Sequence, residues 1–271
     1  MCIRDSIRLE SELRLAIQNN ELELHYQPQV DTRTGSIAGA EALLRWTHPE
    51  RGRVPTDRFL RLAQDIGMMV ELGDWVLEEA CRQLKAFEAE GLKLPRVAIN
   101  VAPAQFTTAF IQRVREVLQQ YEMEPSMLEL GLTEAIMMEG EKNTLAALQE
   151  LHDMGVYLSV DDFGTSYAPL TYLSRYPLDE LKIDRSFVVD FDRSENGARV
   201  LGAIIAMAKS LEMNMVAEGV ETKEQYNFLA DNGAHVVQGY LFSEPVPADR
   251  LRPMLAPWHF TSQVQEIAGT G

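Results

Sequence analysis

Short apolar runs alternate with longer amphipathic segments along most of the chain. Eight runs rich in Val, Ile and Leu predict β-strands, at residues 23–29, 37–45, 97–101, 128–133, 157–161, 180–183, 214–217 and 235–239. Helical periodicity between them predicts helices at residues 74–89, 110–121, 142–154, 198–211 and 223–232. Gly91, Gly155 and Gly233 follow three of these segments, which suits the left-handed conformation that ends many helices.

Eight strands separated by helices favour a closed α/β fold, a (β/α)8 TIM-like barrel, over an open sheet. One connection departs from this pattern. The first two strands are joined by residues 30–36 alone, and Asp31 and Gly35 in this connection are turn formers. A parallel pair needs a crossover of about a dozen residues or more. We therefore expect the first strand to run antiparallel to its neighbour.

The composition is that of one acidic globular domain. The chain has 271 residues, 46% of them hydrophobic, and a formal net charge of −16. This negative charge disfavours duplex nucleic acid and anionic membranes as partners. The longest apolar run, residues 200–208, is too short to span a bilayer, and no secretion leader opens the chain. Cys2 and Cys81 are too few for a disulfide framework, which fits a cytoplasmic protein.

We expect three parts along the chain. Residues 1–6 have no helical or strand pattern and form a non-native-looking or disordered start. Residues 7–258 contain the barrel, and residues 259–271 form a C-terminal tail.

Polar residues lie in or directly after the apolar strands: Glu41, Arg45, Asn100, Glu134, Asp161, Asp162, Lys182, Glu218, Glu221 and Gln238. In a barrel, the carboxyl ends of the strands form one rim, so these residues should converge. Taken singly, each carboxylate could cap a helix or face water, and Lys182 could be a surface lysine. Together, the carboxylates would repel one another without cations. Mg²⁺ or Mn²⁺ is the simplest compensation, because both prefer oxygen ligands.

The sequence disfavours zinc hydrolysis and Ser-His-Asp chemistry. It contains five histidines, and His235 alone lies at an expected strand end. Two divalent ions bridged by a carboxylate suit phosphodiester hydrolysis instead. Lys182 could orient the attacking water or offset charge that builds up on the phosphate.

Several motifs occur in an order that resembles the EAL domain family. They are Glu-Ala-Leu-Leu-Arg-Trp at 41–46, Tyr-Gln-Pro at 26–28, the stretch 100–106, Asp-Asp-Phe-Gly-Thr at 161–165, Lys-Ile-Asp at 182–184, Ala-Glu-Gly-Val-Glu-Thr at 217–222 and Gln-Gly-Tyr-Leu-Phe at 238–242. The resemblance covers about residues 9–251. It implies a phosphodiesterase that opens cyclic di-GMP to linear pGpG with two Mg²⁺ or Mn²⁺ ions, on a barrel whose first strand is antiparallel. It also implies a homodimer and fused or separate sensor or cyclase domains.

The resemblance assigns roles by position. Glu41, Asn100, Asp161, Asp162 and Glu218 resemble metal ligands. Lys182 resembles the residue that positions the attacking water, and Glu218 counts with it among the catalytic residues. Gln27 and Arg45 resemble substrate contacts, with Glu221 and Gln238 as supporting residues on the substrate rim. Glu134 resembles the catalytic-loop anchor that couples dimerisation to metal binding.

The sequence departs from the family at Gly131, where the family has a metal-ligand Glu. Glu129 shares the same strand face, but two residues along a strand span about 6.5 Å, so it should fall short of the metal. Three readings therefore stay open. The domain is a working phosphodiesterase, it is an inactive cyclic di-GMP receptor or protein-interaction module, or it is another metal-dependent phosphoesterase on the same barrel.

Overall fold

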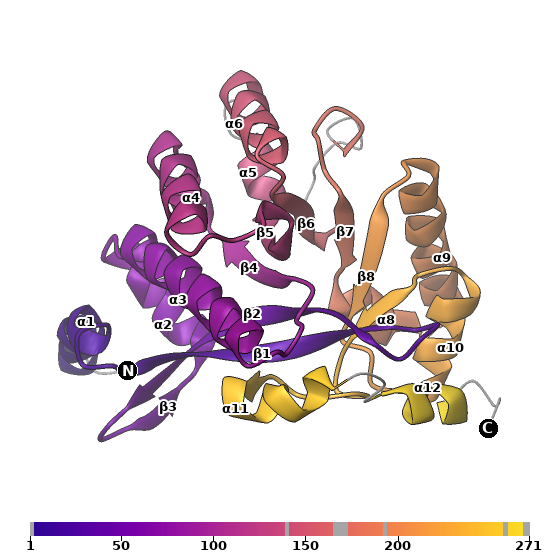
Figure 1. Ribbon diagram of the computed structural model, residues 1–271, viewed down its shortest axis with the longest axis horizontal. Helices are drawn as coiled ribbons and strands as arrows, with labels where there is room; N and C mark the ends of the chain where they lie inside the picture. Colours follow the sequence, from indigo (N-terminus) through magenta and orange to yellow (C-terminus); the bar gives the residue numbers. More distant parts are fainter. Residues whose placement is uncertain (1–2, 139–140, 165–172, 192–193, 257–259, 268–271) are drawn as a thin grey trace.

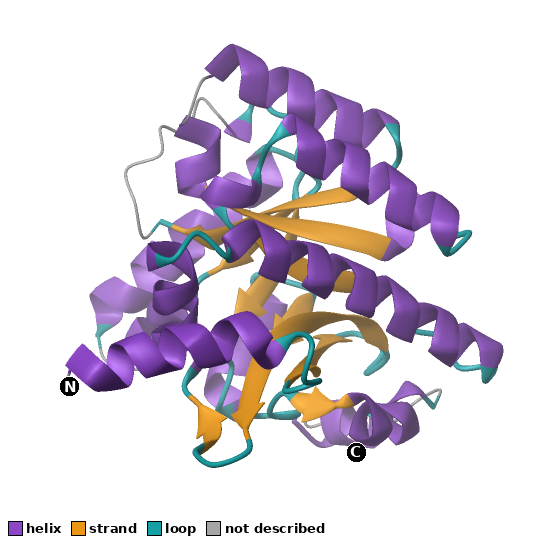
Figure 2. Cartoon of the chain, turned by 90° about the vertical axis from the view of Figure 1, so that its left-hand side faces the viewer, coloured by secondary structure: helices purple, strands orange, loops and turns teal. Residues whose placement is uncertain are grey.

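The computed structural model describes residues 3–138, 141–164, 173–191, 194–256 and 260–267. Within them, eight strands close into a barrel with helices around its outside (Figures 1 and 2). The barrel strands are β1 (Leu22–Asp31), β2 (Ile37–His48), β4 (Val97–Val101), β5 (Leu128–Thr133), β6 (Tyr157–Phe163), β7 (Glu180–Ile183), β8 (Asn214–Glu218) and β9 (Val236–Gln238). Two short strands that the sequence did not reveal add to the sheet, β3 (Gly52–Val54) beside β2 and β10 (Val246–Pro247) beside β1.

Strand β1 runs antiparallel to both of its barrel neighbours, β2 and β9, and the other barrel pairs are parallel. This confirms the α/β barrel and its reversed first strand. A tight turn makes the short connection possible. Asp31 Oδ1 accepts hydrogen bonds from the backbone N–H groups of Arg33 (2.8 Å) and Thr34 (3.1 Å). Gly35 has φ +68°, and a Cβ there would lie 2.6 Å from the backbone of Thr261.

All five predicted helices are present, with ends that differ by a few residues from those expected. The helices are α1 (Ile3–Ala16), α2 (Thr56–Asp65), α3 (Met69–Ala89), α4 (Thr108–Gln120), α5 (Glu134–Met138), α6 (Glu141–Asp153), α8 (Arg185–Phe191), α9 (Glu195–Ser210), α10 (Lys223–Asp231), α11 (Ala248–Leu251) and α12 (Thr261–Ile267). Gly91, Gly155 and Gly233 have φ of +73°, +89° and +84°, as expected for glycines after helix ends. In the described part of the chain, no helix is both long and apolar enough to cross a bilayer.

Helix α1 corrects the expectation for the start of the chain. Residues 3–6 belong to it, whereas we expected neither helix nor strand there; residues 1–2 lie outside the described residues. The helix is stabilised by packing, because Leu9, Leu13 and Ala16 recur on one face and are buried. At the other end, the expected tail contains α12. Its Val264 and Ile267 are part of the hydrophobic core, so packing continues beyond residue 258.

The barrel interior is polar, and the apolar core lies between the strands and the helices. On β5, Leu128, Leu130 and Leu132 alternate with Glu129 and Gly131, and strand side chains alternate between faces. The ladder register places one inward-facing set around the barrel: Gln27, Gln29, Glu41, Asn100, Glu129, Gly131, Ser159, Asp161, Glu180, Lys182, Glu218 and Gln238. A polar column therefore runs from one mouth of the barrel to the other.

Candidate active site

The side chain of Lys182 is the centre of a charged cluster at the carboxyl-end mouth of the barrel. It projects from β7, is fully buried, and its Nζ lies 3.0 Å from Asp161 Oδ1 on β6 and 2.9 Å from Glu218 Oε1 on β8. It also lies 3.4 Å from Glu41 Oε1 on β2, which is not a neighbour of β7 in the sheet. Side chains from distant strands thus meet inside the barrel, as the strand-end pattern predicts.

Amide side chains hold Glu41 in place. Asn100 Nδ2 donates to Glu41 Oε1 at 2.7 Å, and Gln238 Nε2 donates to Glu41 Oε2. Gln238 is itself joined to Gln27 (3.1 Å) and to Gln29 (3.2 Å). Gln29 was absent from the sequence-based candidates, although it lies two residues beyond Gln27 on the same strand face. This network fixes the position of a buried carboxylate.

Three carboxylates provide an oxygen donor set for a cation. One oxygen each from Asp161, Asp162 and Glu218 can be chosen so that all three lie within 4.8 Å of one another. Asp162 adopts φ +53°, a left-handed backbone uncommon outside glycine, at the end of β6. Three carboxylates, of Glu41, Asp161 and Glu218, surround the single ammonium of Lys182, and Asp162 adds a fourth beside Asp161 and Glu218. This excess of negative charge fits the divalent ions implied by the sequence.

Burial and charge shift the pKa values within this cluster. Burial would raise the pKa of Glu41, but Lys182 and the hydrogen bonds from Gln238 and Asn100 hold it below its ordinary value. Burial, together with repulsion from Glu41 and Asp161, raises the pKa of Glu218 to about 8. Burial opposes charge on Lys182, yet the surrounding carboxylates raise its pKa above the ordinary value. The site therefore holds more negative charge than Lys182 alone can compensate.

Burial raises the pKa of Asp162 to about 6, with further contributions from the charges of Asp161 and Asp184. A bound cation would favour the ionised form of such a group.

Gly131 lies beside the cluster, on the inward face of β5. A Cβ at this position would lie 2.8 Å from Asn100 Oδ1 and 3.6 Å from Asp161 Oδ2. A longer side chain there would thus project among the acidic residues. Glu129, two residues earlier, is engaged elsewhere, because Ser159 Oγ donates to its Oε1 at 2.7 Å.

Three sequence-predicted residues lie outside this cluster of contacts. Arg45 is buried on β2, and its Nη1 donates to Leu44 O (2.9 Å) and Thr56 Oγ1 (3.4 Å). Glu221 is paired with exposed Arg185 at 2.8 Å. Glu134 is buried at the start of α5.

The Oε1 of Glu134 accepts a hydrogen bond from Gly164 N at 2.9 Å. Gly164 is the last described residue before 165–172. Glu134 is therefore attached to the beginning of the segment that follows β6, the segment it was expected to anchor.

A cavity of about 380 Å³ opens beside the cluster. Asn100, Asp161 and Asp162 line one part of it, and apolar side chains including Leu60 and Val76 line the rest. Such a mixture suits a ligand that carries both an aromatic base and a phosphate.

Comparison with known proteins identifies the family. Residues 10–245 match the EAL domain. The chain is 44% identical over 255 residues to the cyclic di-GMP phosphodiesterase NbdA of Pseudomonas aeruginosa. The aligned region covers 94% of this chain and 33% of that protein. It is 36% identical over 241 residues to the cyclic di-GMP phosphodiesterase PdeR of Escherichia coli, covering 89% of this chain and 36% of that protein.

A solved structure gives the same result. The PaMucR phosphodiesterase in its c-di-GMP complex matches with a TM-score of 0.86 at 42% identity, covering 90% of this chain and 99% of that chain. The chain spans about a third of the length of the curated relatives named above. The matched range, the identities and the shared barrel agree, and the chain belongs to the EAL domain family.

Proposed function

We propose that this domain hydrolyses cyclic di-GMP to linear pGpG with the help of two Mg²⁺ or Mn²⁺ ions. The observation that carries the proposal is the cluster around Lys182, in which four carboxylates and an amide from four strands meet beside a cavity. Relatives named as cyclic di-GMP phosphodiesterases support the choice of substrate.

The proposed metal ligands are Glu41, Asn100, Asp161, Asp162 and Glu218. Bound divalent ions would activate water and stabilise charge on the phosphate. Lys182 keeps the carboxylates together and directs a positive charge at the mouth of the barrel, where it would position the attacking water. Gln238 restrains Glu41, since its amide donates to that carboxylate.

Substrate contacts are proposed for Gln27 and Arg45, with Glu221 and Gln238 as rim residues. Gln27 and Gln238 are well suited, because they hydrogen bond to each other next to Glu41. Glu134 acts as a positioning residue, through its hydrogen bond to Gly164 N.

We further propose that the domain works in the cytoplasm as a homodimer, within a larger signalling protein or beside one. The length of the curated relatives supports additional domains.

Gly131 favours a second candidate, a receptor that binds cyclic di-GMP without cleaving it. The family resemblance places a metal-ligand Glu at this position, whereas Gly131 has no side chain that could extend toward Asp161. The first candidate is preferred because the other acidic residues of the cluster are retained. Weakened metal binding would slow a phosphodiesterase without removing its substrate site.

The direct test incubates the purified protein with cyclic di-GMP and Mn²⁺ and measures pGpG by chromatography. Glu41→Ala should abolish turnover, while Glu116→Ala, an exposed change on α4, should leave it intact. Turnover that survives Glu41→Ala would refute the metal mechanism. Saturable binding of cyclic di-GMP with no pGpG from the unaltered protein would establish the receptor function instead.

A further inference from the structure

Gln29 is separated from the proposed metal ligand Glu41 by a single side-chain amide. Its side chain projects into the barrel from β1 and is 3% exposed. Its Nε2 donates a hydrogen bond to Oε1 of Gln238 on β9 at 3.2 Å. Gln238 in turn donates from its Nε2 to Oε2 of Glu41 on β2. A continuous line of hydrogen bonds therefore joins Gln29 to the carboxylate.

The direction of the Gln238 amide follows from the groups around it. An ionised carboxylate only accepts hydrogen bonds, so Gln238 must turn its NH2 group toward Glu41. The same Nε2 donates to Gln27 Oε1 at 3.1 Å, and Gln27 is oriented by donating to Ser243 O at 3.1 Å. The carbonyl oxygen of Gln238 then needs a donor on its other side. Among the described residues, Gln29 Nε2 is the only donor to that oxygen.

An inverted Gln238 amide would exchange the places of its oxygen and nitrogen. The oxygen would then face Glu41, where two acceptors repel each other, and the donor that restrains the carboxylate would be lost. Gln29 opposes this inversion, because its own NH2 group would then meet the NH2 group of Gln238. The observed orientation satisfies every partner in the network at once. A donor at position 29 therefore keeps Glu41 restrained.

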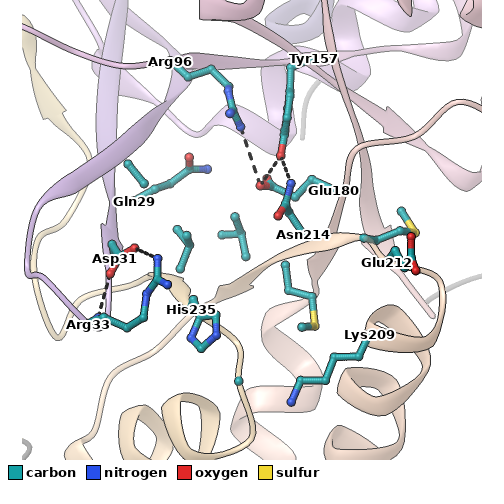
Figure 3. A pocket seen from close by; sticks show the side chains of 16 residues that line it. Gln29, Asp31, Arg33, Arg96, Tyr157, Glu180, Lys209, Glu212, Asn214 and His235 are labelled. Carbon is teal, nitrogen blue, oxygen red and sulfur yellow. Dashed lines mark hydrogen bonds and ion pairs between the residues drawn. The ribbon is translucent and has the colours of Figure 1, made fainter.

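The surroundings of Gln29 accommodate its amide and also decide how it can be tested. Gly39 is its partner in the β1–β2 ladder, and a Cβ at position 39 would lie 2.7 Å from Gln29 Oε1. Gln29 also lines a cavity of about 560 Å³ at the end of the barrel where β6, β7 and β8 begin (Figure 3). Water entering from this cavity could donate to Gln238 in place of a shortened side chain. The informative substitution therefore fills the position without supplying a donor.

We propose that Gln29 is a positioning residue for the metal site, acting through the amide of Gln238 to hold the carboxylate of Glu41 in place for a divalent ion. This role rests on the proposed function, in which Glu41 is a metal ligand. Loss of a hydrogen-bonding partner behind a metal ligand typically lowers metal affinity about 10–100-fold. Gln29 lies one residue further from the ion, so its effect should be at the lower end of that range.

The test compares Gln29→Met with the unaltered full chain. Methionine is also long and flexible, but it has no N–H group to donate. The Kd for Mn²⁺, measured by isothermal titration calorimetry without nucleotide, should rise about tenfold. The matched control is Gln83→Met on α3, because Gln83 is also buried and its Nε2 has no partner among the described residues. Its Kd for Mn²⁺ should stay within about twofold of the original.

A double-mutant cycle measures whether Gln29 acts through Gln238. Gln238→Met removes the amide, so the further change Gln29→Met should alter the Kd for Mn²⁺ by less than about twofold. Side-chain amide NMR of the metal-free protein gives a second readout. The NH2 signal of Gln238, identified by its loss in Gln238→Met, should shift in Gln29→Met and stay in place in Gln83→Met.

An unchanged Kd for Mn²⁺ in Gln29→Met would refute the positioning role, and so would an effect that is equally large with and without Gln238. An unshifted NH2 signal of Gln238 in Gln29→Met would refute it as well. Failure of the proposed function gives a different result. A protein that forms no pGpG, yet binds Mn²⁺ more weakly after Gln29→Met, would retain the positioning role while refuting hydrolysis. Turnover together with an unchanged Kd in Gln29→Met would do the reverse.

Discussion

The backbone of Gly131 lies against the side chain of Asn100, so that a Cβ at position 131 would be 2.8 Å from Asn100 Oδ1. This obstacle is the end of a flexible side chain, which can rotate away. A Glu side chain at 131 would add a carboxylate beside Asp161, whose Oδ2 would lie 3.6 Å from the new Cβ. We predict that Gly131→Glu raises the rate of pGpG formation about tenfold at limiting Mn²⁺, by tighter metal binding. The measurement is the initial rate over a series of Mn²⁺ concentrations.

Gly131→Gln separates charge from shape. It displaces Asn100 to the same extent but supplies a weaker, uncharged ligand, so it should not match the gain of Gly131→Glu. Equal rates in all three proteins would show that position 131 does not limit catalysis. A loss of activity in both variants would show that displacement of Asn100 is what matters.

Lys182 is predicted to stabilise the fold as well as the site, because its ammonium is the nearest cation to the buried carboxylates of Glu41 and Asp161 and to the partly buried carboxylate of Glu218. Lys182→Met should lower the free energy of unfolding by about 3–5 kcal/mol without metal, since uncompensated buried charge is costly. It should also reduce turnover by about a hundredfold or more. Thermal and urea unfolding, each with and without Mn²⁺, measure the first effect.

Added Mn²⁺ should restore part of the stability of Lys182→Met, because a bound cation replaces the lost charge. The control is Lys223→Met, which removes an exposed pair with Glu266 at 3.5 Å and should change stability by less than about 1 kcal/mol. If Mn²⁺ stabilises the variant no more than the unaltered protein, charge compensation is not the role of Lys182.

The sequence predicts the barrel because the strands carry their pattern locally. Each barrel strand contains an apolar run, and the short connection between β1 and β2 requires an antiparallel pair. The strands β3 and β10 were missed because three and two residues are too short to show periodicity. Helix α1 was missed at its start because the recurring apolar positions of the helix, Leu9, Leu13 and Ala16, come after residues 3–6.

The sequence also predicts which residues meet at the carboxyl-end mouth, since strand ends of a barrel share one rim. It does not predict the direction of side chains beyond the strands. Glu221 closely follows β8 in the sequence and was therefore expected on that rim, yet its side chain pairs with Arg185 on the exposed surface. At the other end of the barrel, Arg96 Nη1 lies 3.6 Å from Glu129 Oε2 and 3.8 Å from Glu180 Oε2. This cluster was missed because only the carboxyl ends of the strands were considered. Polar residues at inward positions of strand starts are the signal that reveals it.

Glu134 is predicted to stabilise the end of β6 through its hydrogen bond with Gly164 N. Glu134→Ala leaves this backbone N–H without its acceptor and should cost about 1–3 kcal/mol in urea unfolding. Glu134→Gln keeps an acceptor oxygen and should recover most of that loss. If both variants lose turnover while only Glu134→Ala loses stability, the charge of Glu134 has a role in catalysis beyond positioning the backbone.

Glu180 should make the stability of the domain depend on pH. Its pKa is raised from 4.5 to about 8 in the folded chain, first by burial and then by Glu129, although Arg96 and Lys182 oppose this. Between about pH 5 and pH 8 the unfolded chain releases the proton and the folded chain retains it. Raising the pH through this window therefore favours unfolding, and the penalty is complete above the folded pKa.

Glu180→Gln resembles the protonated acid at every pH, so it removes this penalty. It should match the unaltered protein at pH 5 and exceed its free energy of unfolding at pH 8 by roughly 3 kcal/mol. Urea unfolding at both pH values, with metal chelated, provides the measurement. Glu218 titrates in a similar range but is present in both proteins, so its contribution cancels in the difference. A variant that is less stable than the original at pH 8 would mean that Glu180 is ionised and paired in the folded protein, because only a stabilising ion pair would be lost on neutralisation.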